Sequence, residues 1–214
     1  MRRLMVSSML ALASTSLSTV CVAQDFSLLV GTSEVQFVPM RSAGVTFGCT
    51  LVFKTIALDH IYERGSLLLA VGNIAYVINR EGNNLSFALK LGLQYPLKDP
   101  AMVPPNYAYI DSPSGTTAKS KFVDGGSDSP GYKIFIYQVD DTSASVIGDL
   151  LKGAPVKIGF NRRDGGMDVI LPIDLSVESS TPKAEGGFLR KRSTAAQDEF
   201  RACFNEVTGR LTRR

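Results

Sequence analysis

The chain has 214 residues, of which 44% are hydrophobic and 20% are charged, so it is long and apolar enough to bury a core. One histidine and three cysteines exclude a zinc site made of three histidines and a metal finger made of four cysteines. Residues 1–23 hold two of the 23 basic residues and none of the 20 acidic ones, which leaves 21 minus 20, or +1, for the remainder. A net charge so close to zero in the rest of the chain gives no electrostatic reason to expect nucleic-acid binding.

The N-terminus has the pattern of a secretory signal peptide. Arg2 and Arg3 form a basic start, and residues 4–20 are small and apolar without a charge. Cys21-Val22-Ala23 then places small residues at the two positions that a signal peptidase reads, which predicts cleavage before Gln24.

Two alternatives to simple cleavage stay open. One is a short membrane anchor, for which the stretch is short and rich in serine. The other is a lipoprotein signal ending at Cys21, for which Val20 is a poor preceding residue. We expect residues 1–23 to be removed and residues 24–214 to form one domain.

Cys49 and Cys203 remain after cleavage, and an even number of cysteines in an exported protein predicts a disulfide. It would close a loop of about 150 residues and stabilise the chain by about 5 kcal/mol in a chain-entropy model. Two buried free thiols, or a reactive cysteine, are the alternatives.

Alternating apolar residues predict two β-hairpins. The first pairs residues 74–79 with 87–93 around a turn at 81–84, and the second pairs 156–161 with 169–177 around a turn at 163–166. Pro172 lacks a backbone donor, so it indicates an edge strand or a bulge.

Shorter strands and irregular stretches complete the β part of the prediction. Further strands are expected at residues 26–30, 35–39, 51–58, 67–71, 107–110 and 132–139. The last of these is apolar on both faces, which favours a central strand. Irregular segments are expected at residues 95–106, 112–130 and 178–192.

Two helices interrupt the strands. Residues 142–152 carry an apolar side and end at Gly153. Residues 194–211 begin with Thr194 and Gln197 in the spacing of a capping box and carry an apolar stripe that includes Cys203. The fold class predicted is mainly β: an antiparallel β-sandwich or barrel-like single domain with a short internal helix and a C-terminal helix.

His60 is the only histidine, so a mechanism based on imidazole must use it. The functional interpretation is a hydrolase base oriented by a carboxylate such as Asp59. The structural interpretation is an exposed polar turn, and it is favoured because no serine lies in a Gly-x-Ser-x-Gly motif.

Two segments, Asp124-Gly125-Gly126-Ser127-Asp128 and Asp164-Gly165-Gly166-Met167-Asp168, share a form that could supply oxygen ligands to calcium. Asp-Gly is also ordinary hairpin-turn chemistry, which is the favoured interpretation. No metal and no cofactor are predicted.

Two surface features could serve recognition. Tyr107 and Tyr109 could form an aromatic surface, although alternation by two more often marks a strand face. Arg190-Lys191-Arg192 could contact anionic lipid headgroups, although a solvated linker is favoured. Membrane contact is expected only through this basic C-terminal part or through a lipidated Cys21.

The function expected is non-enzymatic: an exported protein of a bacterial envelope, periplasmic or secreted, that binds a protein or an envelope component with a sheet face or loops. A hydrolase using His60 with a carboxylate, and a structural or assembly subunit of an envelope complex, are the alternatives. No catalytic residue is assigned.

Overall fold

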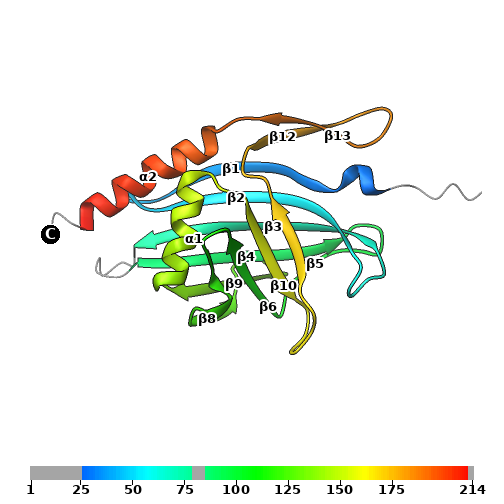
Figure 1. Cartoon of the computed structure of the whole chain (residues 1–214), viewed down its shortest axis with the longest axis horizontal. Coiled ribbons are helices and arrows are strands. Elements are labelled where there is room, and N and C mark those ends of the chain that lie inside the picture. The colour runs from blue at the N-terminus through cyan, green and yellow to red at the C-terminus, as the bar shows by residue number, and fades with distance from the viewer. Residues whose placement is uncertain (1–25, 79–84, 212–214) are drawn as a thin grey trace, which may run out of the picture.

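A computed structural model describes residues 26–78 and 85–211 of the chain. In this part, two antiparallel sheets pack face to face, and two α-helices lie beside them (Figure 1). The predicted mainly-β, sandwich-like fold is confirmed. The large sheet is open, because its strand path ends at two different strands and does not close into a barrel.

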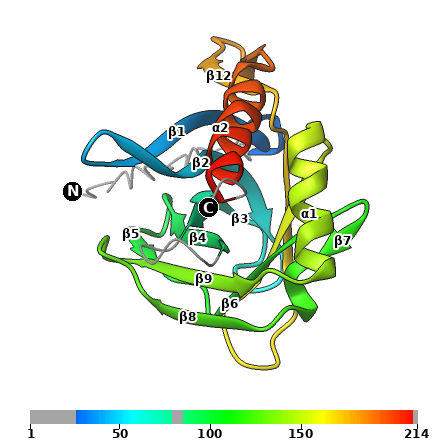
Figure 2. The same cartoon turned by 90° about the vertical axis from the view of Figure 1, so that its left-hand side faces the viewer.

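The large sheet is a meander extended by a second hairpin. Its path runs β1 (Gly31–Ser42), β2 (Val45–Asp59), β3 (Ser66–Ile78), β4 (Leu85–Tyr95), β9 (Tyr132–Gln138) and β8 (Phe122–Gly126), and β5 (Asp99–Val103) also pairs with β4. Figure 2 shows how these strands wrap around one side of the molecule. The first predicted hairpin is confirmed as β3–β4, while its turn lies outside the described residues.

The small sheet runs β11 (Val169–Ile173), β10 (Val156–Asn161), β6 (Tyr107–Ser112) and β7 (Gly115–Thr116). The second predicted hairpin is confirmed as β10–β11. Pro172 lies on β11, which pairs only with β10, so the expectation of an edge strand is also confirmed. A short 3-10 helix, η2 (Thr117–Lys119), follows β7.

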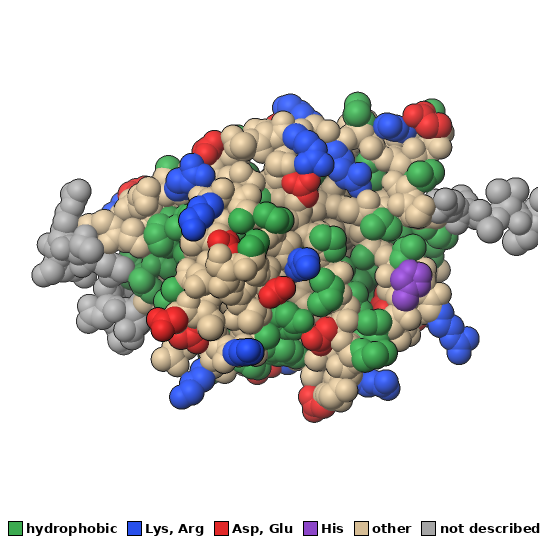
Figure 3. All heavy atoms as spheres, in the orientation of Figure 1, with side chains coloured by type: hydrophobic (Ala, Val, Ile, Leu, Met, Phe, Trp, Pro, Cys, Tyr) green, Lys and Arg blue, Asp and Glu red, His purple; other side chains and the backbone are tan. Residues whose placement is uncertain are grey.

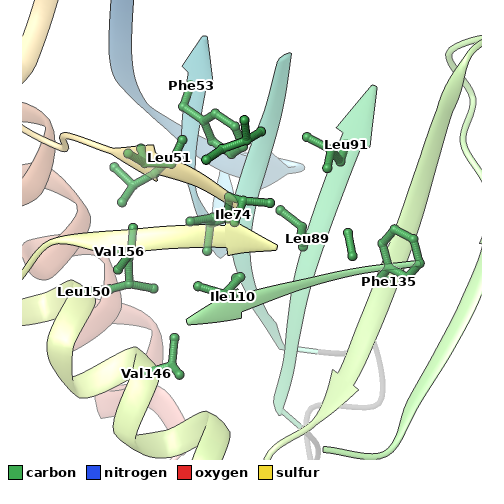
Figure 4. Packing of buried hydrophobic residues seen from close by; sticks show 14 of the residues in the cluster. Leu51, Phe53, Ile74, Leu89, Leu91, Ile110, Phe135, Val146, Leu150 and Val156 are labelled. Atoms are coloured by element: carbon green, nitrogen blue, oxygen red, sulfur yellow. The ribbon is translucent and has the colours of Figure 1, made fainter. Parts of the chain in front are cut away.

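The core fills the space between the two sheets. Every second residue of β2, β3 and β4 points inward, as Leu51, Ile74 and Leu89 do, because side chains alternate across a strand. Figure 4 shows these side chains facing Ile110 and Val156 of the small sheet. Full burial of such a side chain stabilises the fold by about 1.5–3 kcal/mol.

Helix α1 (Asp141–Lys152) matches the predicted internal helix to within one residue. Its N-terminus carries a capping box in which Asp140 accepts from the Ser143 amide and the Ser143 hydroxyl accepts from the Asp140 amide. Its end is at Gly153, whose φ of 72° is left-handed and therefore suits glycine.

Helix α2 (Ala195–Leu211) confirms the predicted C-terminal helix. Phe200, Cys203 and Val207 are buried along one stripe. The predicted disulfide is confirmed, because Cys203 is bonded to Cys49 of β2 at an S–S distance of 2.05 Å. The bond fastens the last helix to the large sheet.

The predicted capping box of α2 is wrong. The Thr194 hydroxyl donates to the carboxylate of Asp198, at 2.8 Å, and the first amide of the helix donates to the hydroxyl of Ser193. The side chain of Gln197 is turned away toward Gly153. Ser193 therefore accepts from the first amide of this helix, while the hydroxyl of Thr194 is bonded to Asp198.

Several predicted boundaries are wrong. Residues 26–30 form a 3-10 helix, η1 (Phe26–Leu29), in place of a strand. The strand expected to run to Val177 stops at Ile173, because Asp174 accepts from the amide and hydroxyl of Ser176 and turns the chain. Residues 67–71 and 74–78 belong to one continuous strand, β3.

The segments expected to be irregular contain strands. They hold β5, β7 and β8, and residues 178–192 belong largely to a hairpin of β12 (Val177–Pro182) and β13 (Phe188–Arg192). These strands bury few residues, so they lack the apolar alternation that marks a core strand. β9 has a strand on each side, as predicted, but its Ile136 is 40% exposed, so only one of its faces is buried.

Candidate functional site

A groove of about 890 Å³ lies where β1 begins, where β11 gives way to β12, and where α1 ends beside the start of α2. Strands β6, β10 and β13 complete its walls. Figure 1 shows these elements meeting on one face, with the β12–β13 hairpin projecting above β1. Its volume is within the range of about 300–1,000 Å³ found for ligand sites. We call this feature the groove.

One wall is held by Arg190 of β13. Its guanidinium donates from Nε to the carbonyl of Thr32 at 2.7 Å and from Nη2 to the carbonyl of Val30 at 2.8 Å. Gly31 between them has a φ of +120°, and a Cβ there would lie 2.9 Å from Nη2. Only glycine lets the guanidinium approach this closely without strain.

Arg192, two residues later on the same strand, forms an ion pair with Asp174 and donates to the hydroxyl of Ser176 at 2.7 Å. Burial alone would raise the pKa of Asp174, but hydrogen bonds from Ser176 and Arg192 outweigh it and hold the pKa below its ordinary value. Asp174 is therefore an anion that Arg192 already neutralises.

Gln197, in the first turn of α2, lines the groove and is only 8% exposed. Its amide packs on Gly153 at the end of α1, where a Cβ would lie 2.8 Å from Oε1. Among the described residues, its carboxamide makes no hydrogen bond. A buried amide without a partner costs about 1–3 kcal/mol, so this side chain has unused binding capacity.

The rim of the groove is largely apolar. Pro113, Pro155 and Pro172 are exposed there, and Val30 is 38% exposed. Lys157 of β10 is exposed between them and forms no ion pair with the part of the chain that the structure describes. The groove thus combines an apolar rim, a buried amide and an ammonium group.

The structure separates the two residues of the predicted hydrolase site. Asp59 is fully buried, and its carboxylate accepts from the amides of Ile61 and Tyr62 and from the hydroxyl of Tyr95, at 2.6–2.9 Å. Burial and this bond to Asp59 raise the pKa of Tyr95 above its ordinary value. His60 is exposed, as the purple side chain in Figure 3 shows, and no hydrogen bond joins it to Asp59.

The two Asp-Gly-Gly segments have different surroundings. Asp124 and Asp128 pair with Lys133 and Lys90, whereas Asp168 accepts from Tyr109 at 3.1 Å and from Asn161 at 3.2 Å. Within residues 26–78 and 85–211, no group of three His, Cys, Asp or Glu side chains is placed to hold a metal ion. The aspartates therefore connect neighbouring strands and loops.

Tyr107 and Tyr109 do lie together, with ring centroids 5.8 Å apart, and Tyr107 also contacts Phe122 of β8 at 5.1 Å. Tyr109 lies over Gly159, whose Cβ would come within 2.5 Å of the ring. Burial and a hydrogen bond to Asp168 raise its pKa to about 12. These rings link the two sheets.

The basic segment 190–192 is part of a strand and each of its side chains has a partner. Arg190 holds the start of β1, Lys191 pairs with Glu178 at 2.8 Å, and Arg192 pairs with Asp174. In Figure 3, blue side chains gather along the upper edge, where Figure 1 places β12 and β13. The segment is therefore a strand and not a linker, although Lys191 and Arg192 are exposed, as expected of a solvated segment.

Sequence reasoning missed the groove and Gln197. The one sequence feature that points to this residue is a glutamine in the predicted first turn of a helix, where the local pattern indicates capping. Gly153, the other partner in this contact, lies 44 residues earlier in the chain. Only the packing of α1 against α2 shows that the two meet.

None of the helices in the described residues combines the length and apolar character that crossing a membrane requires. Comparison of the chain with protein-family models, with curated proteins and with solved structures finds no match.

Proposed function

We propose that the protein is an exported, non-enzymatic binding protein of a bacterial envelope, periplasmic or secreted, and that the groove holds its ligand. Gln197 carries the proposal. A side chain with two donors and an acceptor is held 8% exposed at the groove with no protein partner among the described residues. Unsatisfied buried polar groups are rare, and a ligand would satisfy this one.

Two further observations support the exported location. The first 23 residues have the pattern of a cleaved signal, and disulfides such as Cys49–Cys203 are typical of oxidising compartments. An intact mass of the protein from its native producer tests this part. We expect a chain that begins at Gln24 and gains two hydrogens on reduction. A chain that begins at Met1 would contradict removal of the signal, and a chain that begins at a lipidated Cys21 would make the protein a membrane-tethered component of the envelope.

Binding in the groove can be tested by NMR. The side-chain amide signal of Gln197 is assigned by its loss in the Gln197→Met variant, and the protein is then titrated with a dialysed envelope extract. We expect this signal and the amides of β10 and β13 to shift, while those of β3 do not. Absence of a shift at the groove, with shifts elsewhere, would place binding on another surface.

The two alternatives predict different results. A hydrolase that depends on His60 would lose an activity in His60→Ala, yet Asp59 already accepts from three other donors. An assembly subunit would elute from gentle extracts at a mass far above that of the 190 or so residues left after cleavage. A binding protein is expected to elute near its monomer mass.

A further inference from the structure

The unpartnered carboxamide of Gln197 restricts the chemistry of a ligand in the groove. This group presents an N–H donor and a C=O acceptor side by side. In an extended chain the N–H and C=O of one residue, which belong to the two peptide groups on either side of its Cα, point to the same side, so one residue can satisfy both at once. A carboxylate could accept from the N–H but could not donate to the oxygen.

The apolar side chains at the rim of the groove favour a ligand with apolar parts. Proline side chains offer no hydrogen bonds, and Pro113, Pro155 and Pro172 are exposed around the opening with Val30. A chain with aliphatic side chains would bury them there.

The charges favour an acidic group on that ligand. Three basic and two acidic side chains line the groove. Arg190 binds main-chain carbonyls, and Arg192 and Asp174 neutralise each other. Lys157 is therefore the exposed cation that has no ion pair in the described chain, although Asp111 is its neighbour on β6. A ligand carboxylate would find its counter-ion at Lys157.

We propose that the groove binds an extended peptide segment that carries a carboxylate side chain. The backbone N–H and C=O of one residue pair with the carboxamide of Gln197, aliphatic side chains lie on the proline rim, and the carboxylate meets Lys157. This inference rests on the proposed function and specifies its ligand. The partner is then a protein with an exposed acidic segment.

The test uses three fluorescently labelled hexapeptides of alanine and proline that differ only in one central residue: Glu, Gln or Lys. Their dissociation constants for the mature, oxidised protein are measured by fluorescence anisotropy. We expect the Glu peptide to bind about fivefold more tightly than the Gln peptide and the Lys peptide to bind most weakly.

Two variants and two matched controls assign the contacts. Gln197→Met should weaken the Glu peptide by about fivefold to tenfold, because it removes the paired amide. Lys157→Met should abolish the preference for Glu over Gln. Gln138→Met and Lys119→Met change exposed residues outside the groove and should leave binding unchanged. Thermal unfolding of each variant verifies that it is folded.

Three results would overturn the proposal. Equal affinity for the Glu and Gln peptides would remove the role of Lys157, and unchanged affinity in Gln197→Met would remove the role of the carboxamide. Sodium glutarate that displaces the Glu peptide at equal concentration would make the ligand a small acid. If instead the envelope extract still shifts the groove signals while no peptide binds, the proposed function stands and the peptide assignment fails.

Discussion

Breaking the Cys49–Cys203 bond should lower the stability of the fold strongly. The two cysteines are 154 residues apart, and closing a loop of this length lowers the entropy of the unfolded chain by an amount equivalent to about 5 kcal/mol. For a domain of this size, about 1 kcal/mol corresponds to 2–4 °C, so the melting temperature should fall by about 10–20 °C.

The side chains of the two cysteines make a smaller contribution, which the assay must separate from that of the bond. Urea unfolding is therefore followed for the oxidised protein, the reduced protein, Cys49→Ala, Cys203→Ala and the double variant. We expect the two single variants to lose the same free energy to within about 1 kcal/mol and the reduced protein to match them.

The packing of α2 determines what remains when the bond is broken. Phe200 and Val207 are buried on either side of Cys203, and the ring of Phe204 lies 4.5 Å from that of Tyr76. The helix should therefore stay docked at room temperature after reduction. Reduced protein as stable as oxidised protein, or two single variants that differ widely, would refute the entropic reasoning.

Three further predictions concern single side chains. Asp59→Ala should cost about 3 kcal/mol in urea unfolding, because it leaves one buried and two partly buried donors without their acceptor, and a cost under 1 kcal/mol would contradict this role. Gly31→Ala should cost about 2 kcal/mol in thermal unfolding, whereas Gly44→Ala, which has open space around its Cβ, should cost less. Hydrogen bonds from Ser143 and Thr142 lower the pKa of Asp140 to about 2, so its charged form stabilises the fold above about pH 4 and this contribution is lost as the pH falls toward 2. Asp140→Ala should cost about 1 kcal/mol near neutral pH and almost nothing at the acid end of a pH series of urea titrations; an equal cost at both ends would remove the role of the charge.

The sequence predicts well those elements whose residues face the core. In β3, β4, β10 and β11, the apolar residues that recur at every second position of the sequence lie in the core. The apolar stripe of α2 places Cys203 toward the large sheet. Because the expected removal of residues 1–23 would leave two cysteines and therefore one intramolecular pairing, the disulfide could be predicted as well.

Besides strands that bury few residues, the sequence misses contacts between side chains and backbone that lie far apart in the chain. In the sequence, Arg190 resembles a residue of a charged linker. In the structure, its guanidinium donates to backbone carbonyls about 160 residues earlier. No local pattern reveals such a contact. Gln197 fits the local rule for a capping box, and its actual orientation depends on Gly153 of another helix. Both of these contacts lie in the lining of the groove.

The two ends of the large sheet differ in a way that limits how copies of the molecule could aggregate. At β1, Arg190 occupies backbone carbonyls, Ser180 donates to that of Ser33 at 2.7 Å, and Pro39 has no N–H to offer. At the other end, within residues 26–78 and 85–211, β8 pairs only with β9, so no described strand covers its outer side. Partial cover at the start of β1 and an open side at β8 favour edge-to-edge joining of two copies through β8 over repeated addition of copies at both ends.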